Sequence, residues 1–315
     1  MRNFQQRTIH KSISCTGIGL HSGAMVRLSL HPAPEDAGIV FIRTDLPGRP
    51  SIRACLRNVA HTRLATTLGS DGVCVSTVEH LLSALMGLGV DNVRVELSGA
   101  EVPIMDGSSQ PFVHLLKTAG IRSQDKFKKF IVVKKELTVE EDDKFVTVIP
   151  DKEFSIDYMI KFEHPLIQSQ GLTFRFSDLG YERELSPART FGFLHEVEHL
   201  KKTGFARGGS LSNAVVVDRF NVLNQDGLRF EDEFIRHKVL DFIGDVSLLG
   251  APLIGRFTAC KSGHSLNHAL LNKLFKTPGA WESVEISSPE QCEQKQIYAP
   301  IWGQLHPVER GLAAA

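Results

Sequence analysis

A histidine and two aspartates follow one another at intervals of four residues in the segment HKVLDFIGD, as His237, Asp241 and Asp245. If this segment is a helix, side chains four residues apart lie on one face, so an imidazole and a carboxylate can point to one place. That geometry suits two ligands of a metal ion, and it also suits a hydrogen-bonded pair within the helix, which is the commoner arrangement. The apolar neighbours Leu240 and Phe242 indicate burial. Because buried charged groups need a partner, this setting favours the metal.

A catalytic zinc site usually has three protein ligands and one open position for water. We expect the third ligand to be His80 in another predicted helix, although a lone helical histidine is more often structural. The adjacent Glu79 has two interpretations. It can close a capping box with Ser76, for which the SxxE spacing is right. Alternatively, it can act as general base toward a water molecule at the metal, and we favour this role if a metal is bound.

His264 lies in the turn KSGHSLN, between a predicted strand and a predicted helix. Turns of this kind usually run over the surface, where a histidine would have no catalytic role. If the turn faces a cleft, a protonated His264 can polarise a carbonyl oxygen and later give a proton to a leaving amine. A nearby Asp245 would raise the pKa of this histidine. By contrast, GIGLHSG at 17–23 lacks the spacing of a nucleotide-binding loop, so we interpret it as an ordinary loop.

These side chains require elements that bring distant segments together. Alternating apolar residues predict strands, and apolar residues three and four apart between start and stop signals predict helices. In the first half the predicted strands are 26–30, 39–42 and 93–97, and the predicted helices are 76–88 and 111–120. In the second half the predicted strands are 130–139, 145–149, 154–162, 214–218 and 253–259, and the predicted helices are 232–249 and 265–276. Both halves therefore follow the order strands, helix, strand, helix.

This order predicts an α+β fold of two similar domains. Each would be a mostly antiparallel sheet layered with two helices, and the active site would lie at the interface. The predicted domains are 1–121 and 130–300, joined by a polar linker at 122–129 and followed by a C-terminal tail at 301–315. The second domain carries its insert near 165–213, and long insertions are often functional. The duplication rests on element order alone.

Composition excludes several classes of protein. The 315 residues include 36 basic and 36 acidic side chains, so the zero net charge disfavours a protein that binds nucleic acid mainly through its phosphates. A hydrophobic content of 42% excludes a disordered chain. Five scattered cysteines without a CxxC pair indicate a reducing compartment, and the sequence has no signal peptide or transmembrane segment. We expect a monomeric, cytoplasmic protein with a small-molecule substrate.

Together these residues resemble the UDP-3-O-acyl-N-acetylglucosamine deacetylase family, the zinc amidases of the committed step of lipid A synthesis in Gram-negative bacteria. The similarity covers nearly the whole chain. Its motifs are GIGLHSG at 17–23, STVEHLLSAL at 76–85, IMDGS at 104–108, ARTFGF at 188–193, LNQDGLRFEDEFIRHKVLDFIGD at 223–245 and KSGHSLN at 261–267. The resemblance implies hydrolysis of the N-acetyl group of UDP-3-O-acyl-N-acetylglucosamine. It also implies the family's two similar α+β domains, each with a small insert, and the active site between them.

The resemblance further implies a role for each matched residue. Zinc would be held by three ligands, His80, His237 and Asp241. Glu79 would be the general base, and His264 would stabilise the oxyanion or protonate the amine. The supporting roles are a hydrogen bond from Thr190 to the tetrahedral intermediate, orientation of His264 by Asp245, and contact of Lys238 with the substrate. In the family the second-domain insert forms an apolar passage for the acyl chain, and the residues suited to it here are Phe191, Leu194, Val197, Ala206 and Val216.

Two other functions remain open from the sequence. Another zinc-dependent amidohydrolase, such as a peptidase, would use the same ligands, although HExxH is absent and an acyl-sized passage would argue against it. A noncatalytic binding module, in which HxxxD is only a helix pair, would hold no metal. Two histidines and an aspartate also suit ferrous iron, so the native metal and the preferred acyl-chain length are both open.

Overall fold

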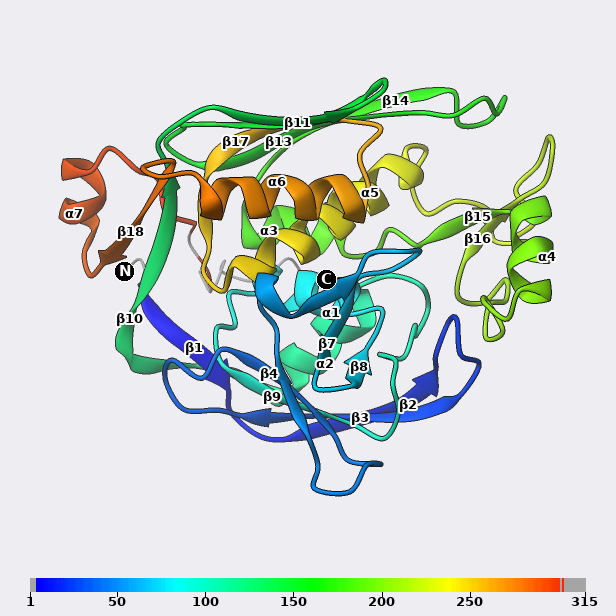
Figure 1. Ribbon diagram of the computed structural model, residues 1–315, viewed down its shortest axis with the longest axis horizontal. Helices are drawn as coiled ribbons and strands as arrows, with labels where there is room; N and C mark the ends of the chain where they lie inside the picture. Colours follow the sequence, from blue (N-terminus) through cyan, green and yellow to red (C-terminus); the bar gives the residue numbers. More distant parts are fainter. Residues whose placement is uncertain (1–3, 301, 303–315) are drawn as a thin grey trace, which may run out of the picture.

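The computed structural model describes residues 4–300 and Trp302, and their fold is of the predicted α+β class. Its two large sheets lie on opposite sides of a central layer of helices (Figure 1). The predicted tail at 301–315 lies outside the described residues except for Trp302. Within the described part of the chain, no helix has both the length and the apolar character needed to span a membrane.

The first half of the chain forms the lower sheet in Figure 1. Its five strands, in spatial order, are β2 (Ile13–Ile18), β3 (Met25–Pro32), β9 (Val93–Leu97), β4 (Ile39–Arg43) and β5 (Ser51–Arg53). A separate three-stranded sheet contains β6 (Val59–His61), β7 (Thr67–Ser70) and β8 (Val73–Val75). The predicted alternation is confirmed in β3, where Val26, Leu28 and Leu30 are buried and Arg27 is exposed. Only the β4–β9 pair of the five-stranded sheet is parallel.

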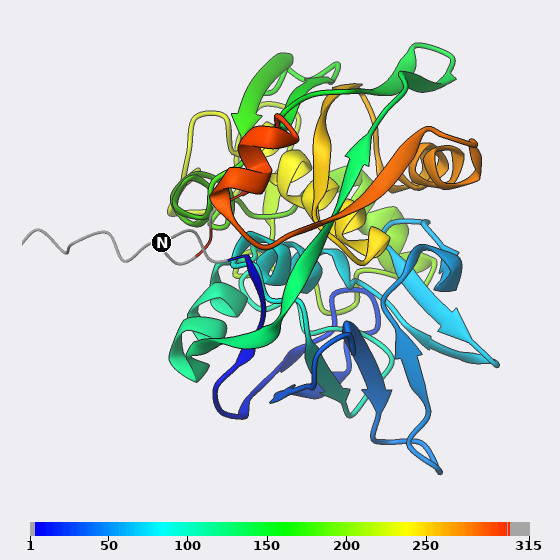
Figure 2. The ribbon, with the colours of Figure 1, turned by 90° about the vertical axis from the view of Figure 1, so that its left-hand side faces the viewer.

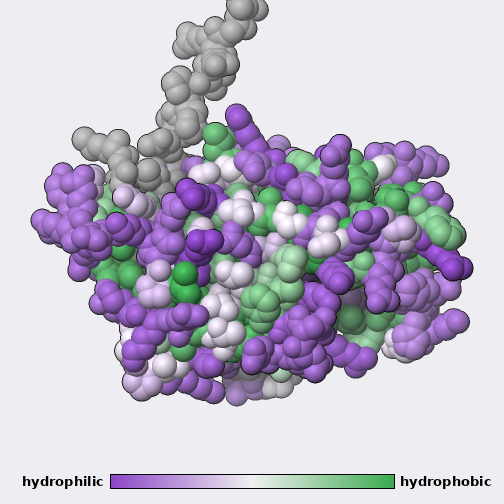
Figure 3. Space-filling model, turned by 90° about the horizontal axis from the view of Figure 1, so that it is seen from above, coloured by the Kyte–Doolittle hydropathy of each residue, from purple (hydrophilic) through white to green (hydrophobic). Residues whose placement is uncertain are grey.

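The second half forms most of the upper sheet. The path through this eight-stranded sheet is β1 (Gln5–Ile9), β10 (Ile121–Val133), β17 (Leu253–Cys260), β12 (Lys144–Ile149) and β11 (Leu137–Glu141). Three further strands pair off this path: β13 (Phe154–Lys161), β14 (Ser169–Arg175) and β18 (Trp281–Ile286). Its pairs are antiparallel except where β17 meets β10 and β13. Hydrophilic side chains cover most of the outer surface seen from above, with smaller apolar areas between them (Figure 3).

The central layer contains the four predicted helices. They are α1 (Glu79–Gly87), α2 (Gln110–Ala119), α5 (Glu233–Val246) and α6 (His264–Lys276). The predicted helix 232–249 ends earlier than expected, because α5 gives way to the 3-10 turn η3 (Ser247–Leu249) before Gly250 reverses the chain at φ 79°. The remaining helical segments are η1 (Leu56–Asn58), α3 (Asp178–Gly180), the π-helical turn η2 (Tyr181–Leu185), α4 (Leu194–Lys202) and α7 (Pro289–Gln294).

The segment expected to be a linker is instead a strand. Residues 122–129 form the first part of β10, a long strand that pairs with β1 near its start and with β18 farther along (Figure 2). Their polar character misled the prediction because most of these side chains lie on the exposed face of the strand. The buried Lys128 forms an ion pair with Asp91. The chain therefore passes between the halves as a paired strand, and the division into two domains stays a prediction.

The insert predicted near 165–213 consists of two different parts. Its beginning is β14, which belongs to the upper sheet through its pairing with β13. Its later part is a separate unit in which β15 (Phe191–Phe193) pairs in parallel with β16 (Val215–Val217), with α4 between them in sequence. In Figure 1 this β15–α4–β16 unit projects to the right, beyond the helix layer. Below, "the β15–α4–β16 unit" refers to residues 191–217.

Candidate metal centre

A glycine allows the two helices that carry the candidate ligands to meet. A Cβ atom at Gly244 of α5 would lie only 2.2 Å from the carbonyl oxygen of Glu79, so any other residue would force the helices apart. One turn earlier on α5, the Leu240 carbonyl accepts a 2.8 Å hydrogen bond from the hydroxyl of Ser83 on α1. The first turn of α1 therefore lies against α5, and His80 comes to the face that carries His237.

Two histidines and one aspartate converge between these helices. Their ligand atoms all lie within 4.8 Å of one another, and the three residues His80, His237 and Asp241 are buried. Asp241 Oδ1 lies 3.5 Å from His80 Nε2 and 3.3 Å from His237 Nε2. The two imidazole rings are nearly perpendicular, at 89°, with centroids 5.0 Å apart. Both histidines thus present the same nitrogen to one carboxylate oxygen.

The surroundings of His237 and Asp241 fit a metal ion, whereas His80 Nδ1 is buried without a hydrogen-bond partner among the described residues. The Ala188 carbonyl lies 3.1 Å from His237 Nδ1, which leaves Nε2 of that ring to bind a metal. Lys238 Nζ donates to Asp241 Oδ2 at 3.0 Å, whereas Oδ1 has no hydrogen-bond partner among the described residues. A buried carboxylate oxygen without a donor is costly. A metal ion held by His80, His237 and Asp241 would provide the missing partner, and nitrogen and oxygen ligands of this kind occur at zinc sites.

The protonation states agree with this chemistry. Burial lowers the pKa of His237 to about 4, against the smaller opposing effect of Asp241, so the ring is the neutral imidazole that a metal requires. Burial alone would raise the pKa of Asp241, but His237 and Lys238 hold it well below its ordinary value. The carboxylate is therefore ionised.

Glu79 is the first residue of α1, and it does not form the capping box. Its Oε2 accepts a 3.0 Å hydrogen bond from the Thr66 backbone N–H, while the Ser76 hydroxyl donates to the Ala100 carbonyl. Thr77 adopts a left-handed φ of 55°, and Val78 occupies the cap position, so Ser76 lies outside the helix turn. The capping interpretation is therefore wrong. Burial raises the pKa of the Glu79 carboxyl, although His264 and His80 oppose the rise.

His264 faces this carboxylate instead of the surface. Asp245 Oδ2 lies 2.8 Å from His264 Nδ1, and the other imidazole nitrogen, Nε2, lies 3.9 Å from Glu79 Oε1. Asp245 Oδ2 also accepts a 2.8 Å hydrogen bond from Asn267, and Oδ1 accepts one of 2.7 Å from the Thr66 hydroxyl. Burial by itself would lower the pKa of His264, but the charge and hydrogen bond of Asp245 raise it to about 9. The imidazole is therefore cationic at neutral pH.

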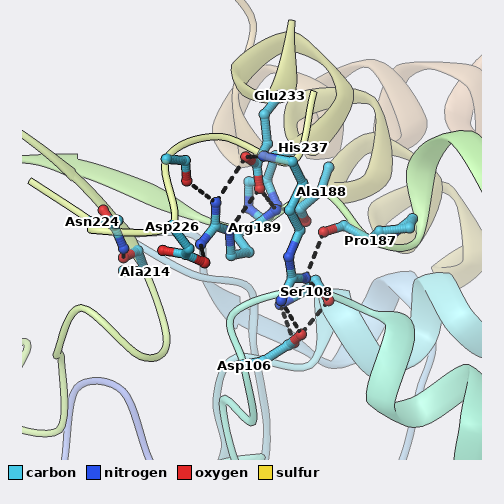
Figure 4. A network of polar contacts seen from close by, with 12 residues as sticks. Asp106, Ser108, Pro187, Ala188, Arg189, Ala214, Asn224, Asp226, Glu233 and His237 are labelled. Carbon is cyan, nitrogen blue, oxygen red and sulfur yellow. Dashed lines mark hydrogen bonds and ion pairs between the residues drawn. The ribbon is translucent and has the colours of Figure 1, made fainter. Parts of the chain in front are cut away.

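The segment ARTFGF closes another side of the site. Arg189 is buried and forms an ion pair with Glu233, which lies one turn before His237 on α5 (Figure 4). Glu233 also accepts a hydrogen bond from the backbone N–H of Arg189. The backbone of Thr190 pairs with Gly107 on one side and with Val215 on the other, each at 2.8 Å. This network holds Ala188 against His237 and holds Thr190 beside the ligands.

The predicted catalytic and ligand residues, except Asp245, line one cavity of about 350 Å³. Asp245 lies behind His264 and reaches the cavity only through that imidazole. The cavity is lined by Leu20, His21, Leu64, Thr77, Glu79, His80, Phe162, Thr190, Phe191, His237, Lys238, Asp241, Ser262 and His264. The structure therefore brings together candidates that lie as much as 185 positions apart in sequence, from Glu79 to His264.

A second, largely apolar cavity of about 420 Å³ adjoins the first. Five residues line both cavities: Leu20, His21, Leu64, Thr190 and Phe191. All of the side chains predicted for an acyl passage line the second cavity: Phe191, Leu194, Val197, Ala206 and Val216. Most of its wall comes from the β15–α4–β16 unit. The candidate metal centre therefore opens beside a space suited to a hydrocarbon chain.

Comparison with known proteins identifies the family. The model of the family LpxC, UDP-3-O-acyl N-acetylglycosamine deacetylase, matches residues 6–276. The chain belongs to this family. It is 55% identical over 282 residues to the UDP-3-O-acyl-N-acetylglucosamine deacetylase of Myxococcus xanthus, covering 90% of each chain. It is also 55% identical to the enzyme of that name from Marinobacter nauticus and 52% identical to that from Saccharophagus degradans, covering 89% and 91% of this chain and 93% and 95% of theirs.

Within this deacetylase family member, sequence reasoning missed three residues of the site. Glu233 carried a usable signal, because it extends the four-residue spacing of His237 and Asp241 by one turn. His21 lines both cavities but lies in the motif interpreted as an ordinary loop, where Glu101 accepts hydrogen bonds from the backbone N–H groups of His21 and Ser22. Thr66 carried no signal, since its acidic partners Glu79 and Asp245 lie 13 and 179 positions away in the sequence.

Proposed function

We propose that this protein is a zinc-dependent amide hydrolase that removes the acetyl group from UDP-3-O-acyl-N-acetylglucosamine. The products would be acetate and UDP-3-O-acyl-glucosamine, in the committed step of lipid A biosynthesis. The proposal rests on one observation. In a chain of the deacetylase family, a buried His–His–Asp cluster lies in a cavity that adjoins an apolar cavity. An acyl-sized apolar cavity beside the cluster argues against a peptidase-like amidohydrolase.

The proposed ligands are His80, His237 and Asp241. When bound, a zinc ion supplies a Lewis acid that polarises the acetamide carbonyl and makes a water molecule easier to deprotonate at neutral pH. Support comes from Asp241 Oδ1, which is buried without a hydrogen-bond donor among the described residues. Ferrous iron would accept the same set of two nitrogens and one oxygen, so zinc is the proposal to be tested.

The protein side chains would divide the proton transfers between them. Glu79 takes a proton from the attacking water as the water oxygen bonds to the carbonyl carbon. The Thr190 hydroxyl and the cationic His264 then stabilise the negative charge on the carbonyl oxygen. When the carbon–nitrogen bond breaks, His264 gives its proton to the amine nitrogen. Asp245 keeps the imidazole cationic and oriented, which the pKa of His264 of about 9 supports.

Substrate binding would use both cavities. Lys238 lines the polar cavity, where its ammonium group would contact the substrate as well as Asp241. The apolar residues Phe191, Leu194, Val197, Ala206 and Val216 would line the acyl passage. A cytoplasmic location and a monomeric state stay predictions from the sequence.

A deacetylation assay tests the whole proposal. The purified protein is incubated with UDP-3-O-acyl-N-acetylglucosamine substrates of several acyl lengths, and acetate release is measured with and without a chelator. We expect release that the chelator abolishes and that added zinc restores. Absence of bound metal together with absence of acetate release would instead indicate a noncatalytic module.

A further inference from the structure

One threonine contacts both acidic residues of the proposed proton-transfer site. The Thr66 backbone N–H donates to Glu79 Oε2 at 3.0 Å, and its hydroxyl donates to Asp245 Oδ1 at 2.7 Å. The Thr66 carbonyl accepts a 3.3 Å hydrogen bond from the N–H of Val78, the residue that precedes α1. All three polar groups of Thr66 are therefore used, and the residue is only 1% exposed.

These bonds tie Thr66 to both α1 and α5, two helices that also pack directly against each other at Gly244 and Ser83. Glu79 belongs to α1 and Asp245 to α5, and Thr66 precedes β7 in the small three-stranded sheet. Asp245 uses Oδ2 to hold His264 and Asn267, while its Oδ1 is held by Thr66. Without the hydroxyl, Oδ1 would be a buried charged oxygen that has lost its donor, so the carboxylate would gain freedom to rotate.

Thr66 also restricts the orientation of the Glu79 carboxylate. Oε2 is fixed by the Thr66 N–H, so Oε1 is the oxygen that faces His264 Nε2 at 3.9 Å. The oxygen–nitrogen separation leaves these groups close together without a direct hydrogen bond. A proton acceptor and a proton donor separated in this way can both reach one substrate amide.

We infer that Thr66 is a positioning residue that fixes the general base Glu79 and the Asp245–His264 pair relative to each other. The inference rests on the proposed function, because it concerns the turnover of that reaction. Thr66 is not among the residues that line either cavity, so it acts through its two carboxylate partners.

Adjacent threonines provide a matched pair of variants. Thr66→Val removes the hydroxyl but keeps the side-chain shape and the backbone N–H to Glu79. Thr67→Val is the control, since the Thr67 hydroxyl is buried but has no hydrogen-bond partner among the described residues. We expect Thr66→Val to lower kcat by about 10- to 100-fold with KM nearly unchanged, which is the range for a lost hydrogen bond to a charged group. Thr66→Ser, which keeps the hydroxyl, should retain most of the wild-type kcat.

A double-mutant cycle separates positioning from a purely structural role. If Thr66 acts through the Asp245–His264 pair, Thr66→Val should lower kcat much less in a His264→Ala background than in the wild type. A structural defect would lower kcat by the same factor in both backgrounds. Bound zinc and the thermal unfolding midpoint are measured for each variant, and Thr66→Ala replaces Thr66→Val if the latter does not fold.

The outcomes distinguish this inference from the proposed function. An inactive wild-type protein with bound zinc contradicts the proposed function. An active wild type in which Thr66→Val turns over as fast as Thr67→Val contradicts only the role of Thr66. Equal losses in both backgrounds of the cycle also overturn it.

Discussion

The two adjoining cavities differ in how the chain builds them. The polar cavity draws Glu79 and His80 from α1, two candidate ligands from α5 and His264 from the start of α6. The apolar cavity takes most of its wall from the β15–α4–β16 unit. Several side chains of the first are held by buried hydrogen bonds, whereas most of the second is an apolar wall from one local unit, which meets the candidate ligands where the Phe191 ring packs against His237. Substitutions in the polar cavity should therefore alter chemistry, and those in the apolar cavity should alter chain-length preference.

The largest effect is expected for His237→Ala. The variant should lose most of its bound zinc and at least about 1,000-fold in turnover, since a metal supplies several kcal/mol of transition-state stabilisation and each 1.36 kcal/mol is tenfold. Metal content after purification and acetate release measure the two effects. His114→Ala, at an exposed position on α2, is the control and should retain both. A fully zinc-loaded His237→Ala protein would remove His237 from the ligand set.

An intermediate effect, dependent on pH, is expected for Asp245→Asn. In the proposed mechanism the active form of His264 is the cation, and its pKa of about 9 means that wild-type kcat should fall as pH rises through about 9. Without the Asp245 charge, burial dominates and lowers the pKa of His264, so the fall should begin at a lower pH. We expect kcat to drop by about 100-fold at pH 8 and by less at pH 6, in line with the usual contribution of a general acid.

The pH profile of kcat provides this measurement. Asp71→Asn is a suitable control, because Asp71 is exposed and its positive φ of 51° is tolerated by asparagine. An Asp245→Asn profile that keeps its high-pH limb at the wild-type position would show that Asp245 does not set the protonation of His264.

The smallest effect is expected in the apolar cavity. Val197→Trp should fill part of the cavity beside Gly192, where an added Cβ atom would lie 3.3 Å from Val197 Cγ2. The value of kcat/KM should fall by about tenfold for long acyl chains and stay nearly constant for short ones, as expected when an apolar pocket loses room for a few methylene groups. Glu198→Trp, on the exposed side of the same helix, should affect neither. Equal losses for short and long substrates would mean that the cavity does not bind the acyl chain.

Much of the site could be predicted because α5 encodes it in one regular pattern. His237, Asp241 and Asp245 lie four residues apart, and the structure adds Glu233 one turn earlier. Helix geometry alone places residues with this spacing on one face, so the sequence was enough to predict that they lie together. The position of the partner helix α1 in the sequence was also predictable. Its close approach to α5 depends on Gly244, because the Glu79 backbone lies against that residue, and the sequence does not show this contact.

Other parts of the prediction failed where a local signal competed with tertiary contacts. The SxxE spacing predicted a cap, but the left-handed Thr77 moves Ser76 away and Thr66 takes the Glu79 carboxylate. The polar segment 122–129 predicted irregular chain, but strand pairing with β1 satisfies its backbone while its side chains mostly face solvent. In both cases the deciding hydrogen bonds come from residues distant in sequence.

The sequence by itself determined the four helices of the central layer, several of the strands, the spacing of the candidate ligands on α5 and the motifs of the deacetylase family, because periodicity and residue type are local properties. Only the tertiary structure decided that Glu79 faces His264, that Thr66 bridges Glu79 and Asp245, and that the polar cavity adjoins an apolar one. The physical reason is that these contacts arise only when the folded chain buries the side chains and pairs them with groups from other segments. A carboxylate has its pKa, its orientation and its role fixed by the groups that exclude water around it, and those groups come from the whole length of the chain.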